Sequence, residues 1–263
     1  MKFLFLYILL FLNFSVISFS GEKKLYQDRN DSTEAILEKA SDYFDTGDET
    51  EALRLYLSVL EAEPENYKAL WNTSFIYTRL GRQQSTYEKQ KEYYEIARTF
   101  ARLTLDAHQD KPRSHYVYGV SSLGLADDMP NSSERIELLH KIKEYGEKAI
   151  SMDPDYAPSW HLMGLWHSNI ANISRRNRLA AKLIYGSLPD GATNEKAVEH
   201  FKTAINLDPT VIIFKLDLAQ HYQEQGEREK AIPLLESILT MQAVSTYNQL
   251  NMKEAKERYN QLK

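Results

Sequence analysis

The histidines are the first residues to consider for chemistry, because imidazole binds metal ions and transfers protons near neutral pH. The chain holds seven of them, scattered along its length, and His161 and His167 are the closest pair in the sequence. A spacing of six residues places two side chains on different sides of a helix, so this pair cannot share a metal ion. We therefore expect no metal site.

Other catalytic patterns are absent from the sequence. It contains no HExxH zinc motif, no P-loop lysine, no GxSxG serine motif and no paired-glycine dinucleotide motif. The lack of cysteine excludes a thiol nucleophile, an Fe–S cluster and a disulfide framework. These absences predict a protein that is not an enzyme and that has no catalytic residues and no cofactor.

The densest run of cations consists of Arg175, Arg176 and Arg178, followed by Lys182. Such a run can dock phosphate or an acidic partner, or it can be a solvated helix face whose charges pair with nearby glutamates. The whole chain carries a formal charge of −5. This acidic balance argues against nucleic acid as a partner and against general affinity for anionic membranes.

A degenerate helical repeat positions these residues. The tetratricopeptide unit is a helix–turn–helix of about 34 residues, with small residues where its helices cross. Residues 33–66 match it in register, through Ala40, Tyr43, Gly47, Ala52, Tyr56 and Pro64. Residues 212–245 match nearly as well, through Ala219, Tyr222, Gly226, Ala231, Leu235 and Ile238.

Between these two units the repeat is stretched. The closing prolines are Pro64, Pro112, Pro154 and Pro209, at intervals of 48, 42 and 55 residues. These intervals predict lengthened helices, one of them over about residues 85–107, and an insertion in the fourth unit. We therefore predict an all-α fold, a superhelix of five irregular tetratricopeptide units over residues 32–245, with a C-terminal capping helix over residues 246–263.

The first helix of each unit lines the concave face of a tetratricopeptide array, which identifies candidate residues for partner binding. The register places these side chains on that face: Phe44, Lys68, Trp71, Phe75, Arg79, Arg113, Tyr116, Val120, His161, Leu165 and Leu216. This lining suits a peptide, or an acyl chain with an anionic head near Lys68, Arg79 and Arg113. The alternative is that the side chains pack against the inserted helices and leave no open groove.

The fourth unit contains an unusual segment, in which HLMGLW is followed by a polar stretch and then by Arg175 and Arg176. A proline-containing turn and a second repeat helix follow, with Pro189, Thr193 and Phe201 as landmarks. This arrangement resembles the signature of the regulator of microtubule dynamics family. The family's Cys–aromatic pair after the tryptophan is His167-Ser168 here, and its aromatic residue before the arginine pair is missing.

The resemblance implies an all-helical binding or scaffold domain and not an enzyme. Eukaryotic relatives are associated with microtubules, and one branch is linked to lipid handling at organelle contact sites. A microtubule partner does not transfer easily to an exported chain, because such a chain does not meet cytosolic tubulin. We therefore carry over the fold and the non-catalytic character only.

Residues 1–20 have the form of a signal peptide. Lys2 precedes an apolar run that ends at about Ile17, and small residues at Ser18 and Ser20 fit a cleavage site. The alternative is an uncleaved membrane anchor formed by residues 3–19. Residues 21–31 are polar and predict a flexible lead-in. We expect an exported protein, periplasmic or extracellular, with membrane contact only if the signal peptide is retained.

Taken together, these features predict a non-catalytic scaffold that engages an unidentified protein or peptide through its concave face. A carrier of a lipid or another hydrophobic ligand, held in a pocket between the groove and the inserted helices, is the alternative. A structural spacer on an uncleaved anchor is a third possibility.

Overall fold

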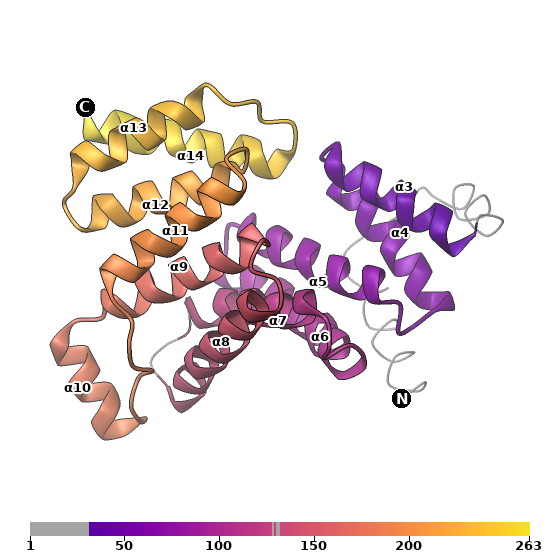
Figure 1. Ribbon diagram of the computed structural model, residues 1–263, viewed down its shortest axis with the longest axis horizontal. Coiled ribbons are helices and arrows are strands. Elements are labelled where there is room, and N and C mark those ends of the chain that lie inside the picture. The colour runs from indigo at the N-terminus through magenta and orange to yellow at the C-terminus, as the bar shows by residue number, and fades with distance from the viewer. Residues whose placement is uncertain (1–31, 128, 130–131) are drawn as a thin grey trace.

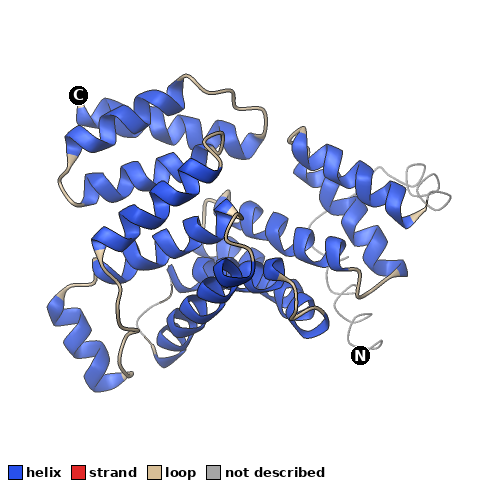
Figure 2. Ribbon diagram, in the orientation of Figure 1, coloured by secondary structure: helices blue, strands red, loops and turns tan. Residues whose placement is uncertain are grey.

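The computed structural model describes residues 32–127, 129 and 132–263, which form helices and loops with no strand among them (Figure 2). The predicted signal peptide (1–20) and lead-in (21–31) lie outside the described residues. Within the described part of the chain, no helix combines the length and apolar character needed to cross a membrane.

Twelve helices lie within the described residues, and ten of them form five hairpins. The hairpins are α3 (Thr33–Asp45) with α4 (Glu49–Ala62), α5 (Tyr67–Arg82) with α6 (Tyr87–Ala107), α7 (Pro112–Asp127) with α8 (Ser133–Met152), α9 (Ala157–Ala171) with α11 (Asn194–Leu207), and α12 (Ile212–Glu224) with α13 (Arg228–Leu239). The other two helices are α10 (Arg175–Ile184), inserted in the fourth hairpin, and α14 (Thr246–Leu262). The predicted all-α architecture of stacked hairpins is confirmed, including the lengthened α6.

Local sequence signals explain where most of these helices begin. Eight of them start after a Ser, Thr, Asp or Asn whose side chain accepts a hydrogen bond from the first turn. Each such cap satisfies a backbone N–H that has no partner within the helix. Short polar segments between the apolar stripes therefore determine where the helices of each repeat begin.

Close helix crossings explain how the hairpins stack. Gly164 of α9 lies against the Phe201 ring of α11, and a Cβ atom added to Gly164 would be 2.7 Å from that ring. The first helices of neighbouring hairpins also lie side by side, with α5 against α7 and α7 against α9. A single hairpin cannot bury its own apolar side, so this stacking builds the core.

The superhelix curves so that the loop leading into α14 comes round toward the first hairpin (Figure 1). Gly47, in the turn between α3 and α4, lies against Ser245, which caps α14, so that a Cβ atom on Gly47 would be 2.7 Å from the Ser245 Cα atom. The Arg79 guanidinium of α5 lies 4.0 Å from the centroid of the Tyr247 ring of α14. The predicted capping helix is present, and its first turn also closes the arc.

This closure can be tested with a matched pair of glycines. Gly47 and Gly226 occupy the same turn in the first and last hairpins, with φ of +90° and +76°. Gly226→Ala is expected to cost about 1 kcal/mol of unfolding free energy, because only the positive φ is strained. Gly47→Ala is expected to cost about 1–3 kcal/mol more, because its Cβ atom also meets the Ser245 backbone.

Urea unfolding measures both losses, and small-angle scattering measures the size of the folded state. We expect a larger radius of gyration for Gly47→Ala than for Gly226→Ala. Equal losses and equal radii would show that the arc is not closed at Gly47.

Candidate functional site: the concave face

Four aromatic rings form a continuous strip at the concave face, in which the Tyr116 ring is buried beneath the surface. The ring centroids of Phe44 and Phe75 are 6.0 Å apart, those of Phe75 and Tyr116 are 6.0 Å apart, and those of Tyr116 and Tyr156 are 5.2 Å apart. We call Phe44, Phe75, Tyr116 and Tyr156 the aromatic strip. The repeat register predicts the first three on this face but misses Tyr156, which precedes α9.

The two arginines predicted beside these rings are already paired within the chain. Arg79 lies over Phe44 and Phe75, at 5.1 and 5.8 Å from the ring centroids, and its Nη2 atom is 2.5 Å from a carboxylate oxygen of Glu49. Arg113 lies 3.8 Å from the Tyr156 centroid and 2.5 Å from Asp153. Because both charges are balanced locally, neither arginine is a free cation for an anionic ligand.

The predicted groove residues differ in accessibility. Lys68, Trp71, Phe75, Val120 and Leu165 are half-buried, as a binding surface requires. Tyr116, His161 and Leu216 are buried, with exposed fractions of 3%, 8% and 0%. These three side chains belong to the packing beneath the concave face and not to its accessible surface. Burial also raises the pKa of the Tyr116 hydroxyl.

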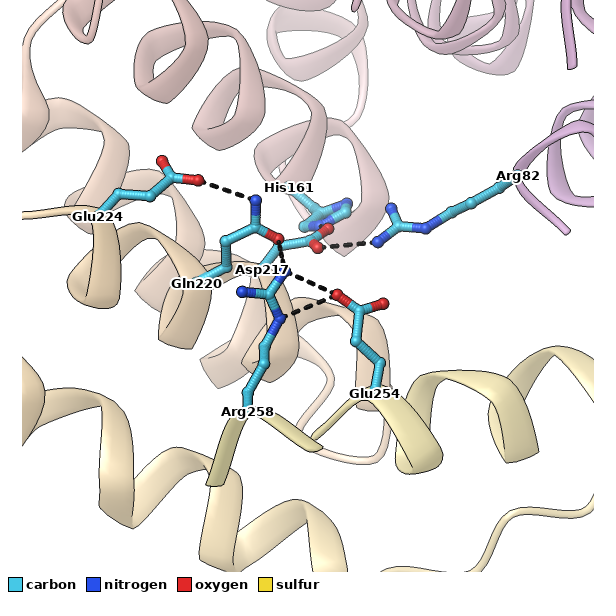
Figure 3. Close-up of polar contacts among 7 residues, drawn as sticks. All are labelled: Arg82, His161, Asp217, Gln220, Glu224, Glu254 and Arg258. Atoms are coloured by element: carbon cyan, nitrogen blue, oxygen red, sulfur yellow. Dashed lines mark hydrogen bonds and ion pairs between the residues drawn. The ribbon is translucent and has the colours of Figure 1, made fainter. Parts of the chain in front are cut away.

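A buried carboxylate joins the second hairpin to the fourth and fifth hairpins (Figure 3). Asp217 of α12 accepts a hydrogen bond from His161 of α9, at 2.8 Å, and pairs with the Arg82 guanidinium of α5, at 3.1 Å. The Asp217 side chain is 4% exposed, whereas Arg82 keeps 36% because it crosses the hollow of the concave face. We call these three residues the Asp217 network.

The surroundings of Asp217 hold its carboxyl group in the charged form. Burial acts to raise its pKa, but the Arg82 charge and the hydrogen bond from His161 outweigh burial and lower the pKa to about 2. At neutral pH the network is therefore an ion pair with an additional hydrogen bond.

A second group of polar contacts ties α14 to α12 beside this network (Figure 3). The Arg258 guanidinium donates hydrogen bonds to Gln220 and Glu254, both at 2.9 Å. Gln220 in turn donates to Glu224 at 2.9 Å. These bonds hold α14 in the position from which Tyr247 reaches Arg79, which lies over Phe44 and Phe75.

A cavity of about 300 Å³ lies between helices α5, α6 and α7 on one side and helices α9, α11 and α12 on the other. Arg82 and Asp217 of the Asp217 network form part of its wall. The rest of the wall consists of apolar and polar side chains, among them Tyr94, Leu165, Ser168, Gln220, His221 and Glu224. We call this space the central cavity. Its mixed lining suits a peptide that brings both apolar and polar groups.

Two carboxylates at the edge of the central cavity flank the same part of α9. Asn169 donates a hydrogen bond to Asp127 at 2.7 Å, and Asn172, one turn later, donates to Glu224 at 3.4 Å. Both carboxylates are exposed at the surface. This edge therefore favours a positively charged side chain on a ligand.

Sequence reasoning misses the Asp217 network, apart from His161. Asp217 does leave a signal, because it lies in the segment 211–219, which is apolar apart from Lys215 and Asp217, and a carboxylate on a buried helix needs a partner. Arg82 leaves none. It is one of several cations at helix ends, and its partner lies 135 residues away in the sequence.

The structure divides the predicted basic run of α10. The Arg178 guanidinium donates hydrogen bonds to the backbone carbonyls of Ile170 and Ile173 at the end of α9. Arg175 and Arg176 are exposed, and neither forms an ion pair with any described residue. Arg175 and Arg176 thus lie on a solvated helix face, without the ion pairs to nearby glutamates that the second interpretation includes.

The histidines occupy separate environments. His161 is bound to Asp217, whereas His167 faces His200 beside a cavity of about 370 Å³ between α8 and α11. Among the described residues, no group of three or more His, Asp or Glu side chains has a geometry that could hold a metal ion.

Comparisons with known proteins match this architecture. A family model described as "Regulator of microtubule dynamics protein 1-3" matches residues 36–263. Regulator of microtubule dynamics protein 1 of Bos taurus is 31% identical over 178 residues, covering 67% of this chain and 55% of that protein. The protein of the same name from Homo sapiens is 34% identical over 122 residues, covering 46% of this chain and 38% of that protein. At most about half the length of these relatives is spanned.

A solved structure supports the fold alone. The crystal structure of a thermophilic tetratricopeptide protein from Thermus thermophilus superposes with a TM-score of 0.62 at 16% identity, covering 88% of this chain and 98% of that one.

Proposed function

Because the chain belongs to the regulator of microtubule dynamics family, we propose that it is a non-catalytic scaffold that binds a segment of a partner protein on its concave face. The observation that carries this proposal is the central cavity, whose wall is built by side chains from four of the five hairpins. A superhelix presents such a continuous inner surface without further folding, which is the usual basis of recognition by helical repeats.

The chemistry of the surface suggests the kind of segment. Half-buried Trp71, Phe75 and Leu165 offer apolar contacts, and Asp127 and Glu224 offer negative charge at the edge of the cavity. We infer a peptide that carries apolar side chains together with lysine or arginine. The names of the relatives concern microtubules, and nothing in this surface selects tubulin.

The alternative of a hydrophobic-ligand carrier stays a prediction. The central cavity is lined by Arg82, Asp217 and Glu224, and charged walls favour a peptide over an acyl chain. Export, which we propose on residues 1–20 alone, would place the partner outside the cytosol.

A peptide-display screen tests the proposal. The full chain is incubated with a library of random decapeptides, and the bound peptides are sequenced. We expect enrichment of peptides that combine basic and apolar residues. Asp127→Lys with Glu224→Lys should weaken their binding about tenfold or more, since like charges then face the ligand.

The control reverses an exposed carboxylate outside the concave face. Glu61→Lys, on α4, should leave peptide binding unchanged. Enrichment that ignores peptide charge, or equal loss in both variants, would exclude the edge of the cavity as the binding surface.

A further inference from the structure

The inserted helix α10 presents its apolar side to solvent. Leu179, Leu183 and Ile184 are 61%, 78% and 67% exposed, and Tyr185, just after the helix, is 37% exposed. Ala181 is the one buried residue of the helix. In Figure 1, α10 projects away from the stacked hairpins at the lower left. Large side chains exposed together in this way indicate a contact surface.

The same helix concentrates positive charge. Four cations lie between residues 175 and 182, and residues 172–189 contain no acidic residue, in a chain with a net charge of −5. On the helix, Leu179 and Leu183 are one turn apart, and Arg175 and Lys182 border the face that they form. Arg176 lies at the N-terminal end of that face. Cations therefore surround an apolar ridge.

Both ends of α10 are fixed to the body of the protein. Arg178 binds the carbonyls of Ile170 and Ile173 at the end of α9. After the helix, the His140 ring lies 3.0 Å from the Ser187 carbonyl, and Pro189 is buried. The helix is thus held outward before any ligand arrives.

We propose that α10 docks on the surface of an anionic lipid bilayer. Its apolar ridge enters the boundary between headgroups and acyl chains, and Arg175, Arg176 and Lys182 contact anionic headgroups, as in basic amphipathic helices. A second copy of the chain is a poor occupant, because two such helices would bring their cations together. The acidic balance of the whole chain does not oppose this contact, since charges more than a Debye length away are screened.

A fluorescent reporter on α10 tests the proposal. The chain has no cysteine, so Ala180→Cys accepts a single environment-sensitive dye. On vesicles of phosphatidylcholine with phosphatidylglycerol, we expect a blue shift and quenching by nitroxide-labelled lipids, and neither on pure phosphatidylcholine. The same dye at Glu257→Cys, on α14, should not respond. Because the dye sits on α10, insertion of residues 3–19 alone would not produce the signal.

Two variants separate the contributions. Arg175→Glu with Arg176→Glu and Lys182→Glu should raise the half-saturating lipid concentration about tenfold or more. Leu179→Ser with Leu183→Ser should remove the blue shift, because no apolar ridge remains. The matched controls, Lys253→Glu with Lys256→Glu and Leu207→Ser with Leu250→Ser, should leave the response unchanged.

The residues exchanged on α10 are exposed, so circular dichroism should show intact folding in every variant. Absence of a shift on anionic vesicles, or a shift that survives both α10 variants, would overturn the proposal. A response to an acidic protein but not to vesicles would also overturn it and would assign the ridge to a protein groove.

Discussion

Replacing Asp217 by alanine is expected to lower the free energy of unfolding by about 3–5 kcal/mol, the loss typical when one partner of a buried ion pair is removed. Asp217 is 4% exposed and binds both Arg82 and His161, so its removal leaves two polar groups without an acceptor. In a chain of this size such a loss lowers the melting temperature by about 10 °C. Calorimetry and urea unfolding measure both quantities.

Glu224→Ala is the matched control, because Glu224 is an exposed carboxylate on the same helix. We expect it to cost less than about 1 kcal/mol. The double variant Arg82→Met with Asp217→Ala should be less destabilised than the sum of its two single variants, because the guanidinium is no longer left without its carboxylate. If Asp217→Ala lowered the free energy of unfolding no more than Glu224→Ala, the Asp217 network would not stabilise the packing of α5 against α9 and α12.

Acidification from about pH 6.5 to pH 4 is expected to destabilise the fold through its buried histidines. Burial is the main cause that lowers the pKa of His167 to about 4, and neighbouring His200, Lys196 and Lys143 act in the same direction. Burial also lowers the pKa values of His200 and His221. In the unfolded chain these rings bind protons at about pH 6.5. The unfolded state therefore binds more protons in this range, and stability falls as the pH falls.

The expected size of this effect is about 3 kcal/mol for His167, since a tenfold change in proton affinity corresponds to about 1.4 kcal/mol. Urea unfolding at constant ionic strength between pH 7.5 and pH 4.5 gives the slope. His167→Gln should flatten it, whereas His140→Gln, at an exposed ring on α8, should not. A slope that is identical in the wild type and His167→Gln would contradict the assignment. Below about pH 4, protonation of Asp217 lowers the stability further, as the pH approaches the pKa of that carboxylate, about 2.

The hairpins could be predicted from the sequence because their signals are local. Small residues such as Ala40 and Gly164, the closing prolines and the polar helix caps all act within one repeat. The register also identifies the face on which Phe44, Phe75 and Tyr116 lie, since that depends on helical periodicity alone.

The closure of the arc could not be predicted in this way. The distance between Gly47 and Ser245 depends on small rotations that accumulate over five hairpins, and no local pattern records their sum. The burial of Tyr116 and Leu216 depends on packing between neighbouring hairpins, which no single repeat records, so the predicted groove contains residues that are buried. The pairing of Arg82 with Asp217 depends on the closure of the arc as well.

The contact between Ser245 and Gly47 has a mechanical consequence. An open array of helical repeats behaves like a spring, which lengthens under tension and can fray one repeat at a time from either end. Here the two ends hold each other, so stretching must first break the contact of Ser245 with the turn between α3 and α4, and the contacts of α14 with α5 and α12. We expect a stiff, closed superhelix that opens abruptly at one force. A partner on its concave face would therefore meet a binding surface of constant width.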